Sequence, residues 1–131
     1  MIILRKLFSL NKADDYRQKV IDRLKKDKID DYDIIEEPPY DVISIEIDPE
    51  ELKINIPTDQ EYVKFEIEDF IRDEIKYYRV KIDSINRYLT VMRVRGLRPL
   101  TINEISNLVE FIINKYEFCS IIEEKEDDDD Y

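Results

Sequence analysis

The sequence has no histidine and no tryptophan, and only one cysteine, one glycine and one alanine. Without histidine it lacks the usual general base, the commonest metal ligand and the side chain that titrates near neutral pH. A single cysteine, Cys119, excludes an internal disulfide and a cysteine-based zinc site, and its apolar strand predicts a buried structural thiol. A single glycine, Gly96, excludes glycine-rich phosphate loops. We therefore expect no enzyme, no cofactor or metal, and no small-molecule substrate.

Long apolar runs are also missing. No stretch of about 18 apolar residues exists, so no transmembrane helix is expected. Residues 1–10 lack the charge order and cleavage site of a secretory signal, which predicts a cytoplasmic protein. Their apolar positions have helical spacing and predict an amphipathic helix that docks on the core or on a partner, with a short strand as the alternative. A membrane surface is disfavoured because anionic lipids repel an acidic protein.

Charge is abundant but unevenly placed. The 131 residues include 32 acidic and 21 basic side chains, for a net charge of −11. Between Arg79 and Arg98 there are six basic residues and one acidic residue, so this segment carries +5 and the remainder −16. The most acidic stretches are residues 27–51 and 123–131. This separation of charge is the most informative electrostatic feature of the sequence.

Four segments follow from composition and periodicity. Residues 1–28 form an N-terminal segment with a helix from about Asn11 to Lys28, because Tyr16, Val20 and Leu24 recur at intervals of four. Residues 29–41 are acidic, end in a proline pair and read as an extended linker. Residues 42–123 form an α+β domain. Residues 124–131 cannot bury apolar surface and are expected to be disordered.

Within the domain, period-two alternation predicts strands at residues 42–47, 53–56, 79–83, 90–95 and 118–122. Helices are expected at residues 59–77 and 102–116. Each follows a capping-box pattern, at Thr58–Glu61 and Thr101–Glu104. On the first helix, Glu66, Asp69 and Asp73 are expected on the outer face, with a Glu68–Arg72 pair, and Val63, Ile67, Phe70 and Ile71 are expected inside.

From residue 53 onward the predicted order is β-α-β-β-α-β, the ferredoxin-like arrangement. We expect an antiparallel sheet of about four or five strands with both helices on one face, plus an extra N-terminal helix and strand. RNA recognition motifs share this topology. The strand at residues 88–96 lacks their RNP1 pattern of basic, glycine and aromatic residues, so the resemblance is topological and implies no binding residues.

The segment 79–96 predicts a hairpin with a basic face. We expect Val80 opposite Met92 and Arg79 opposite Arg93. Like charges directly opposed in a ladder are unfavourable, so a negative group should lie on this face: Glu46, a dimer mate or a nucleic-acid phosphate. The candidate nucleic-acid or anion-binding residues are Arg79, Lys81, Arg93, Arg95 and Arg98.

Two functions agree with these observations. The first is a non-enzymatic acidic interaction module, in some settings a homodimer, that binds a basic protein partner and in the extreme form mimics nucleic acid. The isoleucine-rich, alanine-poor composition resembles coding from an A+T-rich genome, such as that of a virus or a thermophile. The alternative is a nucleic-acid-binding protein that uses the basic hairpin face, with the acidic tail competing for that face.

Overall fold

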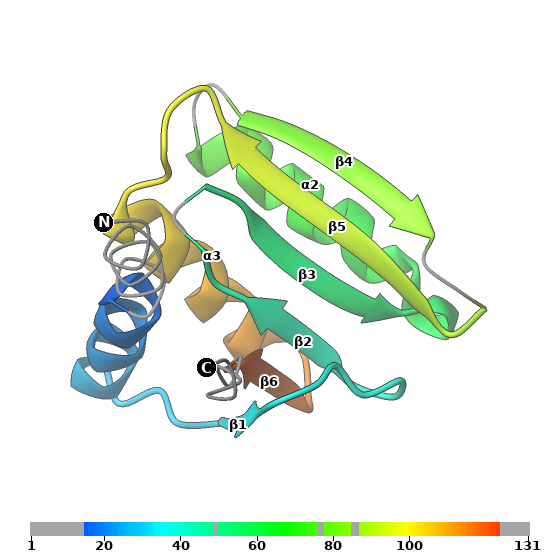
Figure 1. The fold of residues 1–131 in the computed structure, drawn as a ribbon, viewed down its shortest axis with the longest axis horizontal. Coiled ribbons are helices and arrows are strands. Elements are labelled where there is room, and N and C mark those ends of the chain that lie inside the picture. Colours follow the sequence, from blue (N-terminus) through cyan, green and yellow to red (C-terminus); the bar gives the residue numbers. More distant parts are fainter. Residues whose placement is uncertain (1–14, 49, 76–77, 85–86, 124–131) are drawn as a thin grey trace, which may run out of the picture.

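The computed structural model describes residues 15–48, 50–75, 78–84 and 87–123 (Figure 1). The expectations for residues 1–10 and for the tail 124–131 lie outside these ranges. The described chain is a mixed α+β structure with three helices, one covering residues 15–26. None of its helices is both long and apolar enough to cross a bilayer. The elements are β1 (Tyr32–Ile35), β2 (Ile43–Glu46), β3 (Leu52–Pro57), the 3-10 turn η1 (Thr58–Gln60), α2 (Tyr62–Glu74), β4 (Tyr78–Ser84), β5 (Leu89–Gly96), α3 (Ile102–Lys115) and β6 (Cys119–Ile122).

The sheet has six strands in the order β1-β6-β2-β3-β5-β4. It is mixed: β6 runs parallel to both β1 and β2, whereas the pairs β2–β3, β3–β5 and β4–β5 are antiparallel. A ferredoxin-like antiparallel sheet is therefore not confirmed, because β2 lies between β6 and β3. The residues of β2 explain this placement: Ile43, Ser44 and Ile45 are all buried, which suits a strand with a neighbour on each side.

Strand β1 lies within the segment expected to be a linker. It pairs in parallel with β6, with Tyr32 opposite Cys119 and Ile35 opposite Ile122. The short apolar pair Ile34–Ile35 among acidic residues gave too weak a periodic signal to predict it. Phe118 was expected inside the last strand, but it has φ 59° and lies immediately before β6.

Helices α2 and α3 lie against the same face of the sheet, as expected (Figure 1). Val63, Ile67 and Ile71 of α2 are buried against it, and the rings of Phe70 and Phe111 stack at 4.3 Å between the two helices. Both helices therefore follow from their apolar periodicity. The buried residues of α3 are Ile105, Ser106, Leu108, Val109, Ile112 and Ile113.

The two predicted capping boxes have different outcomes. At α3 the Thr101 hydroxyl accepts from the Glu104 amide at 3.1 Å, and the Glu104 carboxylate accepts from the Thr101 amide at 2.9 Å. The capping box predicted at Thr58 does not form. The Thr58 amide donates to the Tyr88 carbonyl at 2.8 Å, η1 intervenes, and α2 begins at Tyr62 without a side-chain cap.

The outer face of α2 pairs differently from the expectation. Arg72 binds Asp69 at 3.0 Å, so the predicted pair with Glu68 is wrong. Glu66 does not lie free on the surface, because it accepts from the Tyr116 hydroxyl at 2.7 Å and pairs with Lys115 at 3.2 Å. These contacts lower the pKa of the Glu66 carboxyl, and the hydrogen bond from Tyr116 makes the largest contribution. The helix ends at Glu74, before the predicted residue 77.

The turn that follows the N-terminal helix contains a residue with a left-handed backbone. Lys28 has φ 63°; its amide donates to the Lys25 carbonyl at 3.0 Å and the Ile29 amide to the Leu24 carbonyl at 2.8 Å. This is the Schellman pattern, in which glycine is the preferred residue at the left-handed position. The helix thus stops before the predicted end at residue 28.

Replacing Lys28 with glycine is expected to raise the free energy of unfolding by roughly 1 kcal/mol, because a non-glycine residue in the left-handed region is strained by about that amount. Urea unfolding should show a higher midpoint with an unchanged slope. The matched control Lys19→Gly lies inside the helix and should lower stability by about 1 kcal/mol. A loss of stability in both variants would contradict the assignment of Lys28 as the cap.

Candidate nucleic-acid interface

The hairpin of β4 and β5 carries two pairs of basic residues on one face. Arg79 lies opposite Arg95, and Lys81 lies opposite Arg93. Because side chains on one face of a strand are two residues apart, the two pairs form neighbouring rows separated by roughly 7 Å. The sequence therefore predicted the correct face.

The predicted register of this hairpin is wrong by two residues. Val80 lies opposite Val94 rather than Met92, and Arg79 lies opposite Arg95 rather than Arg93. A shift of two preserves the faces, so alternation alone cannot detect it. The turn sets the register, and the polar break in this hairpin has no two-residue glycine turn that would define it.

A hollow of about 450 Å³ lies over these two rows. We call it the hairpin hollow. Among the residues that the structure describes, four of its lining side chains are basic, two are acidic and none is aromatic. Its charged residues are Glu51, Arg79, Lys81, Asp83, Arg93 and Arg95.

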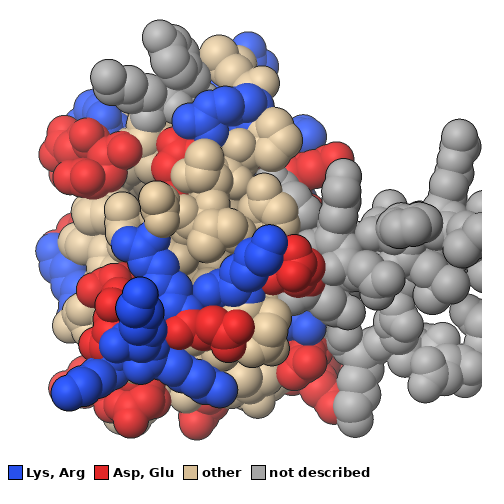
Figure 2. All heavy atoms as spheres, turned by 90° about the vertical axis from the view of Figure 1, so that its left-hand side faces the viewer, with Lys and Arg blue, Asp and Glu red and all other residues tan. Residues whose placement is uncertain are grey.

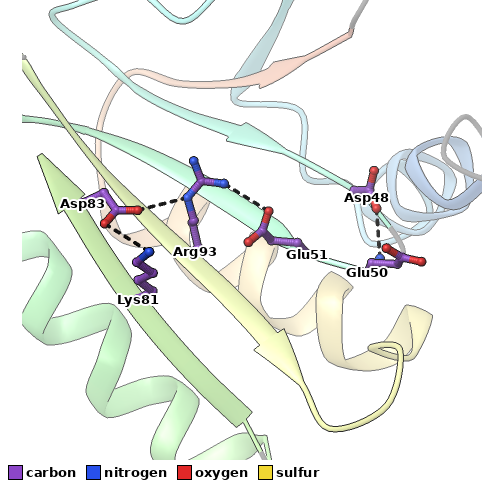
Figure 3. Close-up of polar contacts among 6 residues, drawn as sticks. All are labelled: Asp48, Glu50, Glu51, Lys81, Asp83 and Arg93. Carbon is purple, nitrogen blue, oxygen red and sulfur yellow. Dashed lines mark hydrogen bonds and ion pairs between the residues drawn. The ribbon is translucent and has the colours of Figure 1, made fainter. Parts of the chain in front are cut away.

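Within the hairpin hollow, Arg93 is held between two carboxylates (Figure 3). Its Nε lies 3.2 Å from Asp83 Oδ2, and its Nη1 lies 3.2 Å from Glu51 Oε2. Lys81 Nζ approaches the other oxygen of Asp83 at 3.8 Å. The negative group expected on this face is thus supplied by the chain itself, through Glu51 and Asp83 instead of Glu46.

The turn between β2 and β3 leads directly into Glu51. The Glu50 amide donates to the Asp48 carboxylate at 3.0 Å, which orders the backbone next to Glu51 (Figure 3). Glu46 pairs in the ladder with Lys53, and Lys53 pairs with Arg93, so Glu46 is one strand further away. Sequence reasoning missed Glu51 because it belongs to a turn and shows no alternation.

Arg79 and Arg95 differ from Arg93. Both are exposed, they lie directly opposite each other, and neither forms an ion pair within the described part of the chain. Like charges in this position destabilise a sheet, and nothing described here relieves them. Guanidinium groups bind phosphates and carboxylates through two parallel hydrogen bonds, so this opposed pair is a candidate anion site.

Arg98 does not belong to this group. Its guanidinium binds both oxygens of Glu104, at 2.9 and 3.2 Å, and also donates to the Pro99 carbonyl. This pairing is the main reason that the pKa of Glu104 is lowered. The structure thus brings together four of the five predicted residues and assigns Arg98 to the start of α3.

The end of the molecule at the left of Figure 1 is not a surface of one sign. Figure 2 shows lysine and arginine atoms interleaved with aspartate and glutamate atoms over this end, including the N-terminal helix. Arg23 of that helix binds the Asn103 side chain and, at 3.3 Å, Asn107. An anionic ligand is therefore expected to contact this end locally, at the hairpin hollow, and not along its whole length.

The thiol is buried, as expected. Cys119 is 3% exposed and its Sγ lies 3.5 Å from the Tyr116 carbonyl oxygen. Burial raises the pKa of the thiol to about 11, so the reactive thiolate is scarce at neutral pH. Among the residues that the structure describes, no three cysteine, aspartate or glutamate side chains are grouped to hold a metal ion.

Comparison with protein-family models, with curated proteins and with solved structures gave no match.

Proposed function

We propose that the protein is a non-catalytic interaction module whose hairpin hollow binds the phosphate backbone of nucleic acid. The observation that carries this proposal is the exposed, directly opposed pair Arg79–Arg95, which no described carboxylate neutralises. A phosphate placed between the two guanidinium groups would turn an unfavourable like-charge pair into charge-assisted hydrogen bonds.

The second row supports the same ligand. Arg93 is already oriented by Glu51 and Asp83, so little side-chain freedom is lost when it contacts a neighbouring phosphate. The described lining of the hairpin hollow contains no aromatic side chain, so it offers no platform for base stacking. Binding is therefore expected through the backbone and with little dependence on base sequence.

The net charge of −11 limits the interaction. The acidic body repels nucleic acid at long range, which slows association, and the carboxylates of the hairpin hollow neutralise part of its charge. We expect modest affinity at low salt and little affinity at physiological salt.

A salt titration tests the proposal. The affinity for duplex DNA, measured by fluorescence anisotropy, should fall with a log–log slope of roughly −2 to −3, which corresponds to about two or three phosphate contacts. The variant Arg79→Ala/Arg95→Ala should bind more weakly and flatten the slope by about two. A single-stranded probe should show a shallower slope, near −0.7 per contact.

The matched control is Arg72→Ala/Lys115→Ala. It removes the same charge from α2 and α3, where both residues pair with carboxylates outside the hairpin hollow. It should keep the slope of the unmodified protein. Equal weakening in the two variants would assign the interaction to net charge, and a complete lack of binding at low salt would refute the proposal.

A further inference from the structure

The strand ends opposite the Arg79–Arg95 row carry a set of exposed aromatic side chains. The strand register brings six strand termini together at one end of the sheet. They are the starts of β1, β2, β5 and β6 and the ends of β3 and β4. Large aromatic residues flank four of these strand ends. They are Tyr40 before β2, Tyr62 after β3, Tyr88 before β5 and Phe118 before β6. We call this surface the aromatic end.

All four aromatic side chains are more than half exposed. Tyr40 is 60% exposed, Tyr62 59%, Tyr88 54% and Phe118 74%. The rings of Tyr40 and Tyr88 lie 5.3 Å apart, so two separate loops meet here. Exposed aromatic groups gathered at one place mark interaction sites, because aromatic side chains dominate the energetics of protein interfaces.

The charges around the aromatic end have one prevailing sign. Arg87 lies in the β4–β5 turn, and the nearby Lys64 is paired with Glu61 at 3.8 Å. Acidic residues adjoin the same strand ends and are all exposed, so a partner docking here meets carboxylates on several sides. They are Asp30, Asp31, Asp41, Asp59, Glu61 and Glu117.

We propose that the aromatic end docks an arginine-rich segment of a partner protein. Guanidinium groups are the cations that stack on aromatic faces and also pair with carboxylates through two parallel hydrogen bonds. The aromatic end carries both kinds of group, since Asp41 directly follows Tyr40 and Glu117 directly precedes Phe118. This site lies at the other end of the strands from Arg79 and Arg95, so the inference does not rest on the nucleic-acid proposal.

The test uses the full chain and a fluorescent peptide that alternates arginine and glycine, at an ionic strength of about 0.15 M to screen long-range attraction. The variant Tyr40→Ala/Phe118→Ala changes no charge and should raise the dissociation constant by roughly tenfold. A lysine–glycine peptide should bind more weakly than the arginine peptide. Melting curves verify that the variants fold, as expected for side chains this exposed.

A charge-matched pair of variants separates a site from net charge. Asp41→Asn/Glu117→Gln removes two carboxylates at the aromatic end, and Asp73→Asn/Glu74→Gln removes two exposed carboxylates at the far end of α2. Only Asp41→Asn/Glu117→Gln should weaken peptide binding. Equal effects of the two, or no effect of the aromatic variant, would overturn the proposal. So would self-association in sedimentation that the aromatic variant abolishes, since it would assign this end to a second copy.

Discussion

Replacing Arg95 with glutamate is expected to stabilise the protein and to remove most of its affinity for nucleic acid. Glutamate at this position faces Arg79 across the ladder and converts a like-charge pair into an opposite-charge pair. Both positions are exposed, so the expected gain is only about 0.5 kcal/mol, or roughly 2 °C in melting temperature. The same change removes one phosphate contact and adds a repulsive charge, so affinity at low salt should fall by tenfold or more.

The opposite signs of these two effects make the experiment decisive. If Arg95 contributed mainly to stability, reversal of its charge would lower the melting temperature. If Arg95 contributes mainly to binding, the melting temperature should not fall. Thermal melts and anisotropy titrations on the same sample measure both quantities. The control Arg72→Glu makes the same change in charge on α2 and breaks the pair with Asp69, so it should slightly lower stability and affect binding less. Unchanged binding by Arg95→Glu would contradict the assignment of the hairpin hollow.

Replacing Ile67 with alanine is expected to lower the free energy of unfolding by about 2–5 kcal/mol, because it leaves a cavity between α2 and the sheet. Ile67 is 0% exposed, within the core shared with Val63 and Ile71. Domains of this kind have total stabilities of about 5–15 kcal/mol, so the variant should unfold at a much lower urea concentration.

The control for this variant is Phe65→Ala. Phe65 lies two residues earlier on α2 and is 60% exposed, so its loss should change stability by about 0.5 kcal/mol or less. Similar losses in the two variants, measured by urea unfolding, would show that α2 packs on the sheet through a different face.

The local pattern of residues was sufficient for several features of the site. Alternation in β4 and β5 placed Arg79, Lys81, Arg93 and Arg95 on one face, because side chains point to opposite sides at every step along a strand. The capping box at Thr101 also formed as predicted. In both cases the interacting groups lie within a few residues, so tertiary contacts had little to change.

Features that depend on distant groups were not predictable in this way. The capping box at Thr58 did not form, because the Thr58 amide donates instead to the carbonyl of Tyr88, which directly precedes β5. Arg98 is a different case, because its partner Glu104 lies only 6 positions later; the sequence reasoning did not weigh this local pair, whose two oxygens lie at 2.9 and 3.2 Å. The neutralisation of Arg93 depends on Glu51, which a turn brings beside β5 from 42 positions away in sequence.

The sequence alone determined which side of each predicted helix faces the core, where the basic hairpin lies, and that the chain combines helices with a sheet. These properties follow from periods of about two and 3.6 residues and from the local density of charge. Only the tertiary structure decided that β2 separates β6 from β3, that Tyr32–Ile35 is a strand, and which arginines have carboxylate partners. Strand partners and ion pairs are chosen by the free energy of burying and pairing surfaces far apart in the chain, which no local pattern encodes.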